Sequence, residues 1–237
     1  MIKLNPNNIL ILKIKIPLIK GSILLIIFFL GTTFWLSAQE RPAFAEEVEA
    51  LTQKNDSLWD PNKETIVFTG SSSIRKWDNL QASFPEHQVL NAGFGGSQAS
   101  DLLYYLDTLV IRYNPTKVFI YEGDNDISAK KRPRKIIGTT EMIIGKLRRQ
   151  NPDMKIVLIS AKPSISRWHL RRKYKRLNRK FLRLTKKDVS LLFADVWYPM
   201  LKGKEVKKDI FVSDGLHMNQ KGYDIWFHAM QHLVNNP

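Results

Sequence analysis

The segment TIVFTGSSSIRKW, Thr65–Trp77, joins a short apolar run to a glycine and three serines. The first five residues are all β-branched or aromatic and show no polar alternation, which is typical of a strand buried on both faces of a parallel sheet. Gly70 then permits a sharp turn after the strand. We therefore expect the hydroxyl of Ser72 to lie at the carboxyl edge of a buried sheet.

Four more apolar runs predict four more strands, at Gln88–Ala92, Lys117–Glu122, Lys155–Ser160 and Leu191–Val196. Helix-like segments lie before, between and after the strands, at Arg41–Leu58, Ser97–Tyr113, Arg134–Arg149, Leu170–Lys187 and Asn219–Val234. Strands that alternate with helices predict an α/β fold, in which helices cover both faces of a five-stranded parallel sheet.

The first 38 residues differ in composition from the rest of the chain. A start with four lysines, an uncharged run at 21–36 and a small-residue exit at Ala38 predict a secretory signal peptide. Leu36 is larger than the residue usually found two positions before a cut, so an uncleaved membrane anchor at 21–36 is the alternative. We expect an exported protein, periplasmic or secreted, with three parts: the signal at 1–38, a helical lead-in at 39–62 and one α/β domain at 63–237.

The 237-residue chain has a formal net charge of +15 and contains no cysteine. The lack of cysteine excludes disulfides and a lipid-modified cysteine anchor, so the domain relies on its hydrophobic core. A strong positive charge attracts acidic partners. Because the protein is expected to be exported, nucleic acid is not expected among them.

Polar motifs follow the predicted strands. In open parallel sheets, ligands bind outside the carboxyl ends of the strands, so the residues just after each apolar run are the candidates for a functional site. Three strands are followed there by GSSS, GFGGS (Gly93–Ser97) and GDND (Gly123–Asp126), and DGLH (Asp214–His217) lies near the C-terminus.

Asp214 and His217 are three positions apart, so one short loop can carry both. A serine hydroxyl needs a base to take its proton, and imidazole held by a carboxylate serves this purpose well. An isolated pair of this kind more often contains a capping or surface histidine. Together with the serine and asparagine motifs, we interpret the pair as the base and its partner.

An acyl-transfer reaction also needs donors aimed at the anionic oxygen of its intermediate. The backbone N–H groups near Ser72 and Gly96 and the side-chain amide of Asn125 are the candidates. The alternatives are structural: the glycines also suit a tight strand-to-helix turn, and Asn125 suits a turn stabilised by its own backbone bonds.

In order along the chain, GSSS, GFGGS, GDND and DGLH resemble the four blocks of the SGNH (GDSL-type) hydrolase superfamily. The likeness covers about residues 63–235 and is greatest to the branch similar to the platelet-activating-factor acetylhydrolase catalytic subunits. Members are serine esterases and lipases, including sugar O-deacetylases, with a flavodoxin-like three-layer α/β/α fold. The resemblance implies a serine esterase of this fold that uses no metal or cofactor.

The resemblance implies three roles: a nucleophile for Ser72, an oxyanion hole for Ser72, Gly96 and Asn125, and a base with its partner for His217 and Asp214. The first block usually reads Gly-Asp-Ser, and here Ser71 stands in place of the aspartate. We interpret Ser71 and Ser73 as turn and helix-cap residues. The expected substrate is a carboxylic ester with an acetyl or short acyl group on a glycan or a lipid.

Two other functions compete with this hypothesis. Asp124 and Asp126 could hold a magnesium ion, which would make the protein a metal-dependent phosphoesterase. The segment 162–187 carries twelve Lys or Arg in 26 residues, so it could bind anionic lipid or a polyanion in a non-catalytic envelope-binding module. Its apolar residues at helical spacing predict instead a solvated helix packed on the sheet by Tyr174, Leu177, Phe181 and Leu184. The sequence leaves the oligomeric state open.

Overall fold

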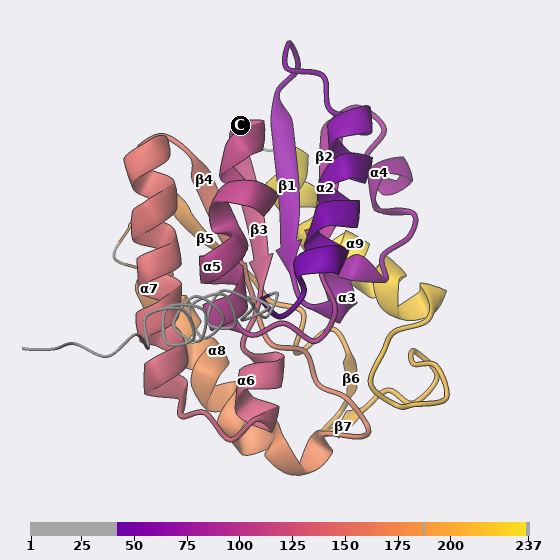
Figure 1. The fold of residues 1–237 in the computed structure, drawn as a ribbon. Coiled ribbons are helices and arrows are strands. Elements are labelled where there is room, and N and C mark those ends of the chain that lie inside the picture. Colours follow the sequence, from indigo (N-terminus) through magenta and orange to yellow (C-terminus); the bar gives the residue numbers. More distant parts are fainter. Residues whose placement is uncertain (1–41, 187, 236–237) are drawn as a thin grey trace, which may run out of the picture. The chain divides into compact units, whose positions relative to one another are not determined.

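The computed structural model describes residues 42–186 and 188–235, whose fold is shown in Figure 1. Five parallel strands form one sheet in the order β2-β1-β3-β4-β5. They are β1 Thr65–Gly70, β2 Gln88–Gly93, β3 Lys117–Tyr121, β4 Lys155–Ile159 and β5 Leu191–Ala194. All five predicted strands are present, and the predicted α/β fold with a five-stranded parallel sheet is confirmed.

Helices flank both faces of the sheet. The apolar cluster on one face includes residues of α2 Ala45–Leu58, α5 Ala99–Leu109, α7 Pro133–Gln150 and α8 Arg171–Thr185. The cluster on the other face includes residues of α3 Ser72–Arg75, α4 Leu80–Ser83 and α9 Gln220–Asn235. The remaining elements are α6 Asp124–Ser128, the 3-10 turns Ile111–Tyr113 and Trp168–Leu170, and a small hairpin of β6 Leu201–Lys202 and β7 Glu205–Val206.

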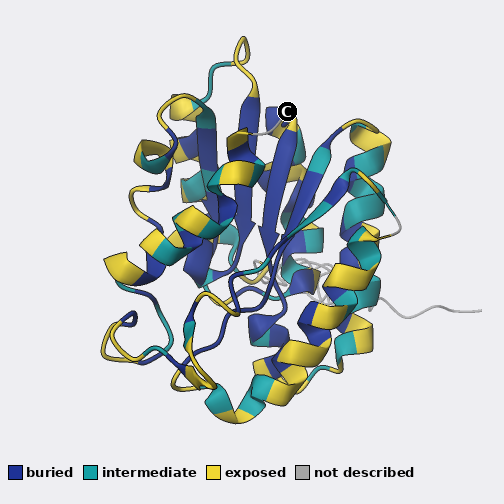
Figure 2. Ribbon diagram, turned by 180° about the vertical axis from the view of Figure 1, so that it is seen from behind, coloured by how far each residue is buried: buried dark blue, intermediate teal, exposed yellow. Residues whose placement is uncertain are grey.

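Successive strand residues point to opposite faces, which is why these strands lack polar alternation. Val67 packs in the apolar cluster on one face, which includes Leu106 of α5. The next residue, Phe68, packs in the cluster on the other face, which includes Trp226 of α9. Phe68 also stacks on Phe119 of β3, with ring centroids 4.1 Å apart. Figure 2 shows the resulting pattern, in which buried strands lie between helices that are exposed on their outer sides.

Helix boundaries follow local capping. The predicted helix 97–113 begins only at Ala99, because Gln98 and Asp101 form a capping box. It ends at Leu109, and a separate 3-10 turn follows at Ile111–Tyr113. The basic helix α8 likewise begins at Arg171 after a 3-10 turn. Each predicted helix is nevertheless present.

Helix α2, in the predicted lead-in, is joined to the sheet domain by polar contacts. The carboxylate of Glu47 accepts hydrogen bonds from Arg75 and from the backbone N–H of Gly95. The amide of Asn55 donates to the carbonyl of Asn91 in β2. The predicted signal or anchor at 1–38 lies outside the described residues. Among those described, no helix combines the length and the hydropathy that a membrane span requires.

Candidate active site

Strand β1 ends at Gly70, whose backbone conformation permits the turn that follows. Its φ of 129° is rarely adopted by other residues, and a Cβ there would lie 2.0 Å from the carbonyl oxygen of Tyr121. The N–H of Ser71 donates to that same carbonyl, and α3 begins at Ser72. Ser71 occupies the N-cap position of α3, as predicted, although its side chain makes no capping hydrogen bond. The turn leaves Ser72 half-buried at the carboxyl edge of the sheet.

Ser72, His217 and Asp214 form one hydrogen-bonded chain. The Oγ of Ser72 lies 3.0 Å from Nε2 of His217. The Nδ1 of His217 lies 2.5 Å from Oδ2 of Asp214. A carboxylate only accepts hydrogen bonds, so Nδ1 carries a proton and Nε2 is left to accept from the serine hydroxyl. This is the tautomer that a general base for serine requires.

The loop that carries His217 is held by backbone contacts. Oδ1 of Asp214 accepts the N–H groups of Leu216 and His217, each at 2.8 Å. The N–H of Val212 donates to the carbonyl of His217, and Nζ of Lys162 donates to the carbonyl of Leu216. Partial burial acts to raise the pKa of Asp214, but the hydrogen bonds from His217 and Leu216 lower it below its usual value. Asp214 therefore remains ionised beside the imidazole.

Two backbone N–H groups near Ser72 are free to bind an oxyanion. Among the described residues, the N–H groups of Ser72 and Gly96 have no hydrogen-bond acceptor. Gly96 has a φ of 70°, and a Cβ there would meet nothing within 4 Å. The space beside Gly96 is therefore open, and its left-handed conformation is what favours glycine at this position.

Asn125 lies in α6 and contacts the second motif. Its Nδ2 donates to the carbonyl of Ser97 at 2.9 Å, and its Oδ1 accepts from Arg167 at 3.0 Å. One N–H of the amide remains. The N–H of Phe94 donates to the carbonyl of Gly70, so the first three motifs are linked through neighbouring strand ends.

The sequence also matches a known protein family. The model of the GDSL-like lipase/acylhydrolase family matches residues 51–225. The chain belongs to this family. A search of curated protein sequences returns no match.

Several solved structures share the fold of this GDSL-like acylhydrolase. A Streptococcus pneumonia protein named for platelet activating factor has a TM-score of 0.70 at 21% identity, covering 89% of this chain and 99% of its own. A GDSL-like lipase from Bacteroides thetaiotaomicron has a TM-score of 0.69 at 19% identity, covering 79% and 96%. A variant of an acetyl-xylooligosaccharide esterase from Geobacillus Stearmophilus has a TM-score of 0.61 at 18% identity, covering 73% of this chain and 95% of its own. At these identities the likeness concerns the fold.

The acidic residues of the third motif are engaged within the acylhydrolase fold. Asp124 is 2.6 Å from Arg167, and its other oxygen is 3.8 Å from Nζ of Lys162. Asp126 accepts the N–H of Ala99 and pairs with Lys131 at 3.2 Å. Each carboxylate is therefore already balanced by a cation of the protein. Within 42–186 and 188–235, no group of three or more acidic, histidine or cysteine side chains is arranged to hold a metal.

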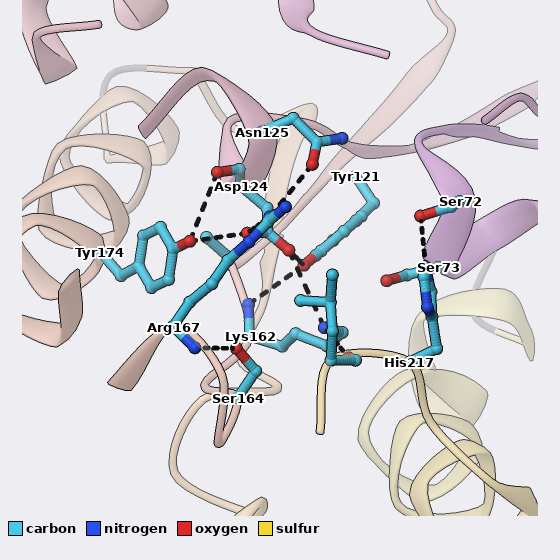
Figure 3. Close-up of polar contacts among 12 residues, drawn as sticks. Ser72, Ser73, Tyr121, Asp124, Asn125, Lys162, Ser164, Arg167, Tyr174 and His217 are labelled. Carbon is cyan, nitrogen blue, oxygen red and sulfur yellow. Dashed lines mark hydrogen bonds and ion pairs between the residues drawn. The ribbon is translucent and has the colours of Figure 1, made fainter. Parts of the chain in front are cut away.

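The polar network around Asp124 was not predicted from the sequence. The sequence places Lys162 and Arg167 in a basic segment, but in the structure the side chain of Lys162 is fully buried and that of Arg167 is 19% exposed. Both follow strand β4, at the carboxyl edge where functional residues gather, and this position was the available signal. Figure 3 shows the two cations on either side of Asp124.

Burial of the network has an electrostatic consequence. Desolvation acts to raise the pKa of Asp124, but Lys162 and Arg167 more than offset it, so that the pKa lies below its usual value. The remainder of the basic segment behaves as predicted: Tyr174, Leu177 and Phe181 of α8 are buried, and Leu184 packs half-buried against the same core.

Proposed function

We propose that this GDSL-like acylhydrolase is a serine esterase with Ser72 as its nucleophile. The hydrogen-bonded chain Ser72–His217–Asp214 is the observation that carries the proposal. Oγ of Ser72 forms a bond to the acyl carbon while Nε2 of His217 takes the hydroxyl proton. The free N–H groups of Ser72 and Gly96 and the remaining amide N–H of Asn125 bind the oxyanion. His217 then protonates the leaving alcohol as the bond to it breaks.

The second half of the reaction uses the same groups. Nε2 of His217 takes a proton from water, and the resulting hydroxide attacks the acyl carbon. The bond to Oγ breaks, Ser72 recovers the proton from His217, and the carboxylic acid leaves. Asp214 keeps the imidazole in the required tautomer and stabilises its charged form in both steps.

An acetyl or short acyl ester on a glycan is the substrate we propose. The similarity in fold to an acetyl-xylooligosaccharide esterase supports this class of substrate. We also propose that residues 1–38 direct export, since their basic start and apolar run are typical of a signal peptide. Mass spectrometry of the protein from the producing cell should find a chain that begins at Gln39. A mature chain that retains residues 21–36 would favour the anchor.

Active-site labelling tests the proposed nucleophile. Wild type should react with a fluorophosphonate probe, Ser72→Ala should not, and Ser73→Ala should react as wild type does. Hydrolysis of p-nitrophenyl acetate in EDTA should fall at least about 10³-fold in Ser72→Ala and in His217→Ala. Labelling that persists in Ser72→Ala would show that another residue is the nucleophile. Turnover of a phosphate ester that chelation abolishes would favour the phosphoesterase.

A basic groove supports a second function, the binding of an anionic polysaccharide. The groove has a volume of about 500 Å³ and lies between one side of α8 and residues 130–134, which comprise the segment after α6 and the first residues of α7. Its lining contains seven cations and no acid: Lys130, Lys131, Arg132, Arg134, Lys173, Arg176 and Lys180. α6 and this segment lie beyond the carboxyl ends of the strands (Figure 1), as Ser72 does. The groove could therefore hold an acidic glycan chain whose ester reaches Ser72.

Charge reversal on α8 tests the groove with a matched control. The triple variant Lys173→Glu, Arg176→Glu and Lys180→Glu should lose binding to dextran sulfate, with little binding of neutral dextran by any form. The control triple Arg172→Glu, Arg179→Glu and Arg183→Glu changes the net charge equally on the same helix and should retain most of the affinity. Equal losses would show attraction by net charge alone. Binding to anionic vesicles but not to the polymer would favour lipid.

A further inference from the structure

We infer that Arg167 is a positioning residue, which orients the amide of Asn125 for the oxyanion. This inference rests on the proposed esterase reaction. Arg167 lies between β4 and α8, and its Nη1 contacts Oδ1 of Asp124 at 2.6 Å and Oδ1 of Asn125 at 3.0 Å. Figure 3 shows its guanidinium extending toward both residues.

The two ends of the Asn125 amide have partners of opposite kind. A guanidinium has only donors, so the atom that faces Arg167 must be the amide oxygen. The carbonyl of Ser97 has only an acceptor, so the atom that faces it must be the amide nitrogen. Together they leave one orientation of the amide. The second N–H of Nδ2 is then the only polar group of this side chain still available to an oxyanion.

Arg167 is itself held in place. Asp124 receives hydrogen bonds from Tyr174 at 2.7 Å and from Tyr121 at 3.1 Å, and Lys162 lies 3.8 Å away. The backbone N–H of Arg167 also donates to the hydroxyl of Ser164. Arg167 is therefore anchored at its backbone by Ser164 and at its guanidinium by Asp124. Such a supporting contact restricts the rotamer of a reacting group without touching the substrate.

Loss of Arg167 would leave the amide oxygen without its donor. The amide could then rotate and present its oxygen, which repels an oxyanion, where its N–H should be. Removal of one oxyanion donor typically lowers kcat by about 10²–10³-fold, and a loss of orientation should cost part of this. We expect Arg167→Ala to lower kcat by roughly 10–100-fold, with KM changed less than about twofold.

A double-mutant cycle with Asn125 separates positioning from general damage. Hydrolysis of p-nitrophenyl acetate is measured for Arg167→Ala, Asn125→Ala and the double variant. If Arg167 acts through Asn125, the double variant should be no slower than Asn125→Ala alone. Arg167→Lys keeps a cation for Asp124 but lacks the fork, so it should lose less than Arg167→Ala. Arg183→Ala, on the exposed side of α8, serves as the control and should match wild type.

The outcomes also separate this inference from the proposed function. Losses that multiply in the double variant would overturn the inference, and so would an Arg167→Ala enzyme with wild-type kcat while Asn125→Ala is impaired. A raised KM at unchanged kcat would instead make Arg167 a substrate contact. Failure of wild type to react with the fluorophosphonate probe would remove the esterase itself. If Arg167→Ala does not fold, the same cycle is measured with Arg167→Lys.

Discussion

Nζ of Lys162 donates a 2.7 Å hydrogen bond to the carbonyl of Leu216, the residue before His217. Lys162 follows β4, and on its other side it lies 3.8 Å from Asp124, at the start of α6. One buried cation therefore connects the loop of the candidate base to the motif that carries Asn125. Burial lowers the pKa of Lys162, and the charge of Asp124 works against this effect.

Substitution of Lys162 by Met should destabilise the protein, because Asp124 would keep only one cation and the Leu216 carbonyl would lose its donor. We expect the free energy of unfolding to fall on the order of 3 kcal/mol, measured by urea titration. Lys155→Met, at the other end of β4, should cost less than about 1 kcal/mol. Equal effects of the two substitutions would contradict a structural role for the buried contact.

Asp214→Asn should lower kcat by roughly 10⁴-fold, because the wrong tautomer of His217 would face Ser72.

The native pKa of Asp214 lies below its usual value, so its carboxylate stabilises the fold above about pH 4 and loses this contribution as the pH falls. Urea unfolding should thus show wild type more stable than Asp214→Asn at pH 6, with a smaller difference at pH 2.5. Asp209→Asn, an exposed control in the same part of the chain, should show neither effect. A constant difference between pH 6 and pH 2.5 would contradict this assignment.

Glu122 should make the stability of the protein depend on pH in the opposite sense. Burial raises the pKa of Glu122 well above its usual value, and the hydrogen bond from Ser97 only partly offsets this. As the pH rises above about 4.3, the unfolded chain releases this proton while the folded protein retains it, so the free energy of unfolding falls. Glu122→Gln should lack that fall between pH 4.5 and 8. Glu86→Gln, at an exposed position, should show the same fall as wild type. If the free energy of unfolding changed with pH equally in wild type and Glu122→Gln, this would contradict the argument.

The two glycines with positive φ near Ser72 should respond differently to alanine. At Gly70 a Cβ would lie 2.0 Å from the carbonyl of Tyr121, so Gly70→Ala should prevent the native turn and yield little folded protein. At Gly96 a Cβ would meet nothing within 4 Å, so only the left-handed conformation opposes it. Gly96→Ala should therefore fold with a loss of about 1–2 kcal/mol. Circular dichroism and thermal melting distinguish the two, and equal stability would contradict the steric argument.

The sequence alone determined the strands, the helices and the edge of the sheet where polar motifs gather. These follow from local properties: a run such as Thr65–Thr69 has no polar alternation, and the glycine after it permits a sharp turn that other residues would oppose. The family blocks added roles for single residues, which stay predictions, and the family match over residues 51–225 confirmed the family itself.

Only the tertiary structure decided which atoms meet. Ser72 and His217 are 145 positions apart in sequence, and their 3.0 Å contact depends on how the loop before α9 packs against the sheet. Arg167 looked like one more cation of a basic helix, whereas its side chain extends inward to Asp124 and Asn125. Composition gives the charge of a segment, but the direction of each long side chain is set by the partners that the fold brings to it.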